Sequence, residues 1–178
     1  MANQHHRPDW AEKSPALREY HDHEWGVEQH DDQKLFEILS LETYQTGLSW
    51  ETVLMKRDAF RKAFDNYDID QVAKISEGAI NDMMENSAII RNKRKLDSTV
   101  NNAKVVQKIQ SSGQTFDHYL WSFVDGKPQK IVRDADGGRV VENELSQQMA
   151  KQMKKDGFKF VGPVTLFTYM FAIGMLVD

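Results

Sequence analysis

Hydrophobic residues recur along most of this chain at the three- and four-residue spacing of an α-helix. Leu35, Ile38 and Leu39 form such a stripe in the segment after Asp32, and the same spacing follows Ser49. Aspartate and serine suit the first positions of helices, because their side-chain oxygens accept hydrogen bonds from backbone amides that have no intrahelical partner. The pattern therefore predicts an all-α protein.

Helices are predicted to begin near residues 31, 49, 68, 76, 88, 116, 143 and 163. The longest extends from about Ala88 to Gln110. The last follows Gly162-Pro163 and is apolar on all sides over about fourteen residues. A helix of that length is too short to span a bilayer, so we expect it to lie buried among other helices.

The segment from residue 125 to 141 has a different pattern. It contains glycine, proline and the sequence Asp136-Gly137-Gly138 between two pairs of β-branched residues. Asp-Gly supplies the positive φ angle that a hairpin turn needs. We predict one long loop or small hairpin here, inserted in an otherwise helical bundle.

The length and composition are those of one ordinary globular domain over residues 1–178. This domain can consist of two helical lobes with a pocket between them. The net charge of −4 argues against broad attraction to polyanions, although it allows a local basic patch. The chain has no cysteine, which excludes disulfides and zinc sites built on sulfur. The N-terminus has no apolar signal segment, so we expect a cytoplasmic protein that does not enter a membrane.

Glu42 is the most informative single residue, because it continues the apolar stripe of Leu35, Ile38 and Leu39. A buried carboxylate is costly and needs a partner, a proton or a function. Trp50 follows after a turn at Gly47, so an acid and an indole would form a pocket for a flat, electron-poor ring. The alternative is a glutamate at a helix end that reaches water.

A second candidate site is the segment from Gly157 to Pro163, where a helix ends, a short apolar hairpin follows and a new helix begins. The free amides of such a hairpin can hold one phosphate, with Lys159 supplying positive charge nearby. The alternative is a plain structural connection between two helices.

Five segments occur in a fixed order along the chain. They are Tyr20-His21-Asp22-His23-Glu24-Trp25-Gly26-Val27, Leu41-Glu42 with Gln45-Thr46-Gly47-Leu48-Ser49-Trp50, Ile89-Ile90-Arg91, Leu120-Trp121-Ser122-Phe123-Val124, and Gly157-Phe158-Lys159-Phe160-Val161-Gly162. Together they resemble the DNA-3-methyladenine glycosylase I family of helix–hairpin–helix DNA glycosylases. The resemblance covers about residues 10 to 176.

This resemblance implies a monofunctional enzyme that excises 3-methyladenine from alkylated double-stranded DNA and leaves an abasic site. It implies that Glu42 contacts the methylated adenine, that Trp50 stacks on it, and that Tyr20 lines the same pocket. Trp25 lies in the same motif as Tyr20 and is assigned to the pocket with it. Free 3-methyladenine would be the product, no cofactor is expected, and the protein is expected to be a monomer. The rival interpretation is a helix–hairpin–helix DNA-binding protein with impaired catalysis.

The DNA contacts are also expectations. Leu48, beside Gly47, is a candidate wedge for the gap left by a flipped base, or else a hydrophobic staple against the next helix. Lys159, Val161 and Gly162 are expected to hold the DNA backbone. A basic cluster at Arg91, Lys93, Arg94 and Lys95 contacts phosphates or forms a solvated helix face.

The sequence departs from the family at two points. His21 matches one zinc ligand of the family, but the cysteine partners are absent. The alternative ligands are His5, His6, His23 and His30, from which we do not expect a four-ligand site, so we predict no zinc site. Leu17 stands where many members have a second tyrosine, which predicts the loss of one contact in the pocket and a lower substrate affinity.

Overall fold

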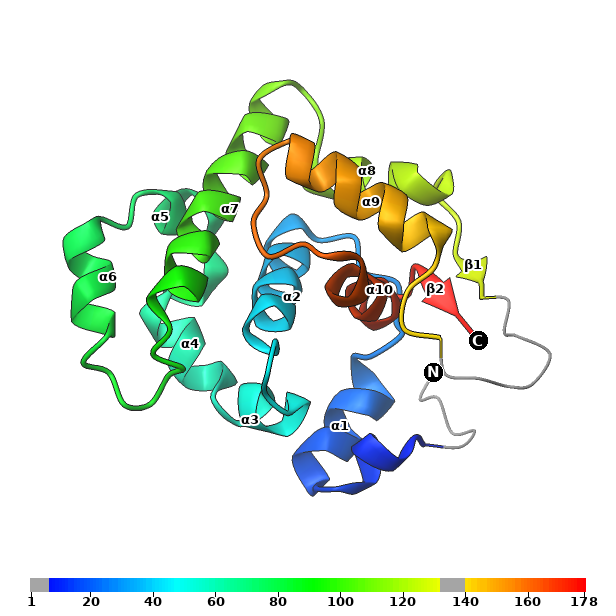
Figure 1. The fold of residues 1–178 in the computed structure, drawn as a ribbon, viewed down its shortest axis with the longest axis horizontal. Helices are drawn as coiled ribbons and strands as arrows, with labels where there is room; N and C mark the ends of the chain where they lie inside the picture. Colours follow the sequence, from blue (N-terminus) through cyan, green and yellow to red (C-terminus); the bar gives the residue numbers. More distant parts are fainter. Residues whose placement is uncertain (1–6, 132–139) are drawn as a thin grey trace.

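The computed structural model describes residues 7–131 and 140–178. These residues fold almost entirely into helices, which confirms the predicted all-α class (Figure 1). The first half of the chain contains the 3-10 helix η1 (Asp9–Glu12), α1 (Pro15–His23), α2 (Asp32–Tyr44), α3 (Trp50–Met55), α4 (Arg57–Ala63), η2 (Asp65–Tyr67), α5 (Ile69–Ala73) and α6 (Glu77–Met83). The second half contains α7 (Lys93–Ser111), α8 (Phe116–Trp121), η3 (Ser122–Val124), β1 (Gln129–Lys130), α9 (Glu144–Lys155), α10 (Pro163–Ala172) and β2 (Leu176–Val177).

Several helices begin at a residue whose side chain accepts a hydrogen bond from a backbone amide of the first turn. Asp31 does this for α2, Ser49 for α3, Asp68 for α5 and Ser76 for α6, which confirms the predicted starts. Asn92 caps α7 in the same way. Each cap satisfies an N–H group that has no partner inside the helix, so local sequence sets where these helices begin.

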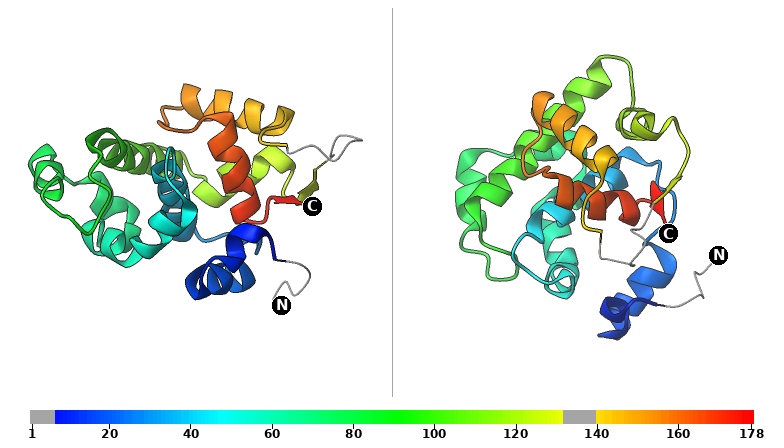
Figure 2. Two further views of the ribbon diagram at one scale, coloured as in Figure 1. Left: turned by 60° about the horizontal axis from the view of Figure 1, so that its bottom comes forward. Right: turned by 45° about the vertical axis from the view of Figure 1, so that its right-hand side comes forward.

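α2 is the central helix of the molecule. α4 to α7 lie on one side of it and α8 to α10 on the other, as two views of the ribbon agree (Figures 1 and 2). Every residue from Leu35 to Tyr44 is buried. The sequence predicted one buried stripe on this helix, but α2 is buried on all faces because helices surround it.

Two helix boundaries differ from the prediction. α7 begins at Lys93 and not near Ala88, because Asn92 is extended and caps the helix. α10 is 10 residues long and ends at Ala172, shorter than the fourteen predicted. The chain turns at Gly174, where φ is +80° and an added Cβ would lie 2.7 Å from the backbone nitrogen of Glu28. The positive φ is incompatible with a right-handed helix, so α10 cannot continue through Gly174, and only glycine fits the close approach.

The C-terminal end of the chain pairs with the segment after η3. Gln129 lies opposite Leu176 and Lys130 opposite Val177 in a short parallel ladder. The predicted hairpin turn at Asp136-Gly137-Gly138 lies outside the described residues, so that expectation stays a prediction. Within residues 7–131 and 140–178, no helix has both the length and the apolar character needed to cross a bilayer.

Candidate active site

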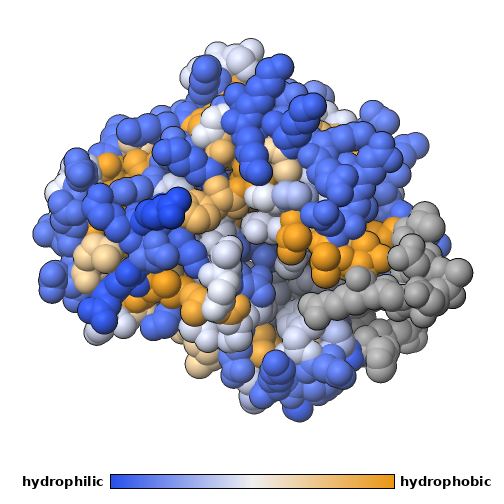
Figure 3. Space-filling view, viewed as in Figure 1, coloured by the Kyte–Doolittle hydropathy of each residue, from blue (hydrophilic) through white to orange (hydrophobic). Residues whose placement is uncertain are grey.

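A cleft of about 400 Å³ opens between α1, the end of α2, the start of α3 and α10. The space-filling view is hollowed at this place, between α1 and the helices α3 and α10 (Figure 3). The lining combines several aromatic rings with one acid. Its residues are Trp10, Lys13, Tyr20, Trp25, Glu42, Gln45, Ser49, Trp50, Val140, Phe167, Thr168 and Phe171.

Glu42 lies in the last turn of α2 and faces this cleft, which confirms the predicted inward orientation. It is 3% exposed, and among the described residues no side chain or amide donates a hydrogen bond to its carboxyl group. Burial raises the pKa of Glu42 from 4.5 to about 8, because the charged form is poorly solvated there. A positively charged ligand bound beside this carboxyl group would favour its charged form and lower its pKa.

A second buried acid on α2 shows what a structural glutamate looks like in this protein. Glu37 is 6% exposed, but its Oε1 accepts a hydrogen bond of 2.7 Å from Arg57 Nε and lies 2.8 Å from Arg61 Nη2. Its charge is therefore balanced by two guanidinium groups. Glu42, five residues further along, has no such cation among the described residues, and this difference makes it the candidate functional acid.

Tyr20 and Trp50 form one wall of the cleft. Their ring centroids are 5.4 Å apart and their planes are inclined by 49°. Burial, together with the nearby Glu42, raises the pKa of Tyr20 well above its ordinary value, so the phenol keeps its proton. The indole Nε1–H of Trp50 is buried and has no hydrogen-bond partner among the described residues, which leaves an unsatisfied donor at the cleft.

Trp25 belongs to a second group of aromatic side chains that line the cleft. Its ring stacks on His21 at 5.3 Å on one side and on Phe171 at 6.1 Å on the other. Trp10 meets Trp25 edge to face at 5.9 Å. Trp10 and Phe171 are cleft residues that the sequence did not identify, because only tertiary contact brings them to α1 from opposite ends of the chain.

The described residues around His21 do not fit a zinc ion. His21 is 3% exposed, its Nδ1 is 3.0 Å from Asp22 Oδ1, and its ring is stacked on Trp25. In the described part of the chain, no three His, Asp or Glu side chains converge as metal ligands. Asp22 instead pairs with Arg7 through Nε at 2.9 Å and Nη2 at 2.6 Å. Leu17, the other departure, is 1% exposed in the core and is not part of the cleft lining.

The turn between α2 and α3, residues 45–48, is here called the wedge turn. Gly47 has a φ of +81°, a backbone conformation that favours glycine. Leu48 follows it and is 38% exposed, at the cleft's edge next to Ser49. This exposure argues against a staple packed on the next helix, and the wedge role stays a prediction.

The connection from Gly157 to Gly162 is here called the phosphate hairpin. It joins α9 to α10, as predicted, and Pro163 is the first residue of α10. Lys159 is exposed, whereas the Val161 side chain is fully buried. Val161 could therefore meet a phosphate only through its backbone, while Lys159 has a free side chain for it.

The predicted basic cluster is partly wrong. Arg91 and Arg94 are exposed, but Lys95 is 5% exposed and points into the protein. Its ammonium group donates hydrogen bonds to backbone carbonyls in α2 and the wedge turn. Lys95 is therefore engaged inside the protein and is not placed as a phosphate contact.

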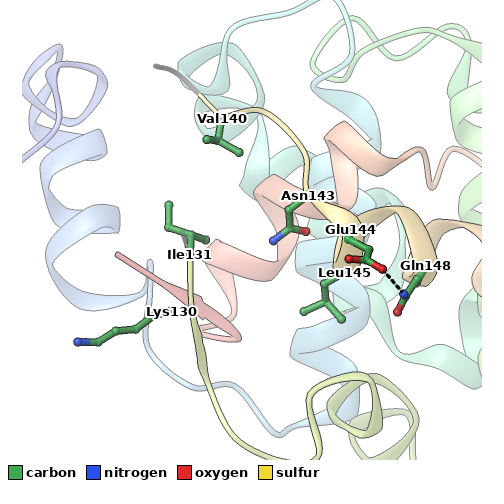
Figure 4. Close-up of a pocket in the computed structure, with 7 residues that line it drawn as sticks. All are labelled: Lys130, Ile131, Val140, Asn143, Glu144, Leu145 and Gln148. Atoms are coloured by element: carbon green, nitrogen blue, oxygen red, sulfur yellow. Dashed lines mark hydrogen bonds between the residues drawn. The ribbon is translucent and has the colours of Figure 1, made fainter. Parts of the chain in front are cut away.

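A larger cavity of about 530 Å³ lies between the end of β1 and the start of α9 (Figure 4). Its described lining has no aromatic ring, and its one acid, Glu144, is exposed and accepts a hydrogen bond from Gln148 at 3.3 Å. It offers neither a stacking surface nor a buried charge, so the smaller aromatic cleft is the better candidate site.

Known proteins share the sequence pattern and the fold of this chain. The methyladenine glycosylase family model matches residues 10–178. The DNA-3-methyladenine glycosylase of Haemophilus influenzae is 40% identical over 174 residues, which cover 97% of this chain and 93% of that protein. A crystal structure of 3-methyladenine DNA glycosylase I has a TM-score of 0.91 and 38% identity, covering 97% of this chain and 95% of the other.

A further solved structure holds a ligand. It is a Tyr-to-Phe variant of 3-methyladenine DNA glycosylase I in complex with 3-methyladenine, with a TM-score of 0.87 and 35% identity over 92% of this chain and 88% of the other. The fold and these similarities define the class of the protein, which is a DNA glycosylase. Within that class, the chain belongs to the methyladenine glycosylase family.

Proposed function

We propose that this protein is a monofunctional glycosylase that hydrolyses the N-glycosidic bond of 3-methyladenine in alkylated double-stranded DNA. The observation that carries the proposal is Glu42, a buried acid without a cationic partner, in a cleft walled by Tyr20, Trp25 and Trp50. We further propose that the chain acts as one domain and as a monomer in the cytoplasm, with the base pocket between two helical lobes.

The cleft is suited to a flat cation. Methylation at N3 gives the adenine ring a positive charge, and a cation over an aromatic face gains up to about 2 kcal/mol when it is desolvated. The Glu42 carboxylate can accept a hydrogen bond from the exocyclic amine and oppose the ring charge. Neutral adenine gains less from both contacts, so the site selects the damaged base.

The chemistry needs little help from the protein, because the positive charge already weakens the bond to the sugar. The bond between the base nitrogen and the sugar carbon breaks, its electron pair moves to the base, and neutral 3-methyladenine leaves. Water adds to the sugar carbon as it develops oxocarbenium character, and releases a proton to solvent. The products are the free base and an abasic site.

The DNA contacts follow from the exposed segments beside the cleft. The base must first leave the helical stack, which costs a few kcal/mol and less when the base is damaged. We assign Leu48 to the gap that the base leaves. We assign the backbone amides of Val161 and Gly162, with the Lys159 side chain, to a phosphate of the same strand.

The test is a base-release assay on duplex DNA treated with a methylating agent, with chromatographic separation of the released bases. We expect free 3-methyladenine in the supernatant and an intact strand until alkali cleaves the abasic site. Unmethylated DNA of the same sequence is the control. A protein that binds methylated DNA and releases no base would be a binding module, and the proposal would be wrong.

A pH dependence follows from the burial of Glu42. Its pKa is about 8 in the empty cleft, so below that pH the free enzyme must lose a proton before the acid can oppose a cation. We expect kcat/KM for excision to rise up to tenfold per pH unit from pH 6 to 8 and to level off above pH 8. Single-turnover rates across this range measure it, and a flat wild-type profile would exclude this role for Glu42.

A further inference from the structure

The two DNA-facing segments of the proposed enzyme are both attached to one helix, α7. The wedge turn and the phosphate hairpin are more than a hundred residues apart in the sequence. α7 contacts the first through Lys95 and the second through Asn101 and Asn102. One rigid element therefore lies between the group that would displace a base and the group that would hold a phosphate.

Lys95 attaches the wedge turn. Its Nζ donates hydrogen bonds to the carbonyl oxygens of Tyr44 at 2.7 Å and Thr46 at 2.8 Å. These carbonyls lie at the C-terminal end of α2, where carbonyl groups have no intrahelical partner and the helix dipole is negative. Among the described residues no carboxylate pairs with Lys95, and these two carbonyls accept the hydrogen bonds of its ammonium group.

Asn102 attaches the phosphate hairpin seven residues further along, two turns of the same helix and on the same face. Its side-chain amide forms two hydrogen bonds with the backbone of Lys159, from Lys159 N to Oδ1 at 2.9 Å and from Nδ2 to Lys159 O at 3.1 Å. Asn101 Nδ2 donates to Gly157 O at 2.9 Å, and the Arg94 guanidinium lies 5.9 Å from the centre of the Phe160 ring. The hairpin is therefore held to α7 at Gly157, Lys159 and Phe160.

We propose that Lys95 is a positioning residue that holds the wedge turn at a set distance from the phosphate hairpin. This inference rests on the proposed function, since it concerns how Leu48 is aimed at the DNA. Seven helical residues span about 10 Å, and this spacing fixes where Leu48 enters the duplex relative to the gripped phosphate. Without the tether the turn moves independently of the hairpin, and displacement of the base becomes less efficient.

The distinguishing experiment separates base displacement from base binding. Lys95→Met keeps the length of the side chain and removes both hydrogen bonds. We expect the single-turnover rate of excision from duplex DNA to fall at least tenfold, while the affinity for free 3-methyladenine, followed by tryptophan fluorescence, changes less than threefold. Excision from single-stranded methylated DNA, where no partner base or stack must be broken, falls less than excision from duplex.

Lys104→Met is the matched control, because Lys104 is an exposed lysine on the same helix. We expect it to retain the wild-type excision rate. If Lys95→Met proves too unstable to purify, Asn102→Ala removes the hydrogen bonds between α7 and the phosphate hairpin instead. It is expected to lower the rate of duplex excision at least tenfold and to change the affinity for free 3-methyladenine less than threefold.

Two results would overturn the proposal. Equal losses of free-base affinity and duplex excision would show that Lys95 only supports the fold of the cleft, and an unchanged duplex rate would show that the tether has no effect. A wild-type protein that released no base would instead overturn the proposed function, and this inference with it.

Discussion

Replacing Glu42 by glutamine is expected to lower kcat/KM for 3-methyladenine excision about 100-fold at pH 8. The amide keeps the size of the side chain and an oxygen that accepts a hydrogen bond, but it has no charge to oppose the methylated ring. A hydrogen bond to a charged group in a buried site is worth up to about 3 kcal/mol, and about 1.4 kcal/mol corresponds to a factor of ten. Single-turnover base release from methylated duplex DNA measures the loss.

The same substitution is expected to make the protein more stable. Glu42 is protonated in the fold up to about pH 8, whereas its ordinary pKa is 4.5, so above pH 4.5 unfolding lets the acid ionise. The wild-type free energy of unfolding therefore falls as the pH rises from 4.5 to 8 and stays level beyond. At pH 7 the raised pKa lowers the free energy of unfolding by about 3 kcal/mol. Glutamine does not ionise, so the variant does not have this loss.

Urea unfolding at pH 5 and at pH 8 separates this effect from general changes in packing. The gain for Glu42→Gln should be small at pH 5 and several times larger at pH 8. Loss of activity combined with lower stability at both pH values would mean that the acid supports the fold and has no role in recognition.

Much of the candidate site could be predicted because its signals are local. The spacing of Leu35, Ile38, Leu39 and Glu42 fixes which way the acid faces, whatever surrounds the helix. The turn at Gly47 then brings Trp50 to the same side, and the structure confirms both positions along the cleft. Helix starts were predictable for the same reason, since a capping side chain acts within three residues.

What the sequence could not predict depends on contacts between distant residues. Lys95 lies in a run of basic residues typical of a solvated face, and only the carbonyls of Tyr44 and Thr46, about fifty positions earlier, account for its burial. Trp10 and Phe171 carry no motif of their own and enter the cleft through tertiary packing. The early end of α10 depends likewise on Gly174 meeting the backbone near Glu28.

Glu37→Gln is expected to have the opposite pair of effects, although it is the same chemical change on the same helix. It removes the carboxylate that pairs with Arg61 and one of the two that pair with Arg57, whose side chain is only 13% exposed and which keeps Glu24. Losing hydrogen bonds to a charged, partly buried group destabilises a protein by about 2 kcal/mol. We therefore expect a clear drop in the midpoint of urea unfolding at pH 7.

Excision by the folded Glu37→Gln protein is expected to stay within about threefold of wild type, because Glu37 faces a separate hollow with Glu24, Arg57 and Arg61. Rates must be compared at a temperature where both variants are fully folded, which circular dichroism verifies. If Glu37→Gln abolished excision while Glu42→Gln did not, the reacting base would have to bind on the arginine side of α2, and the aromatic cleft would be the wrong site.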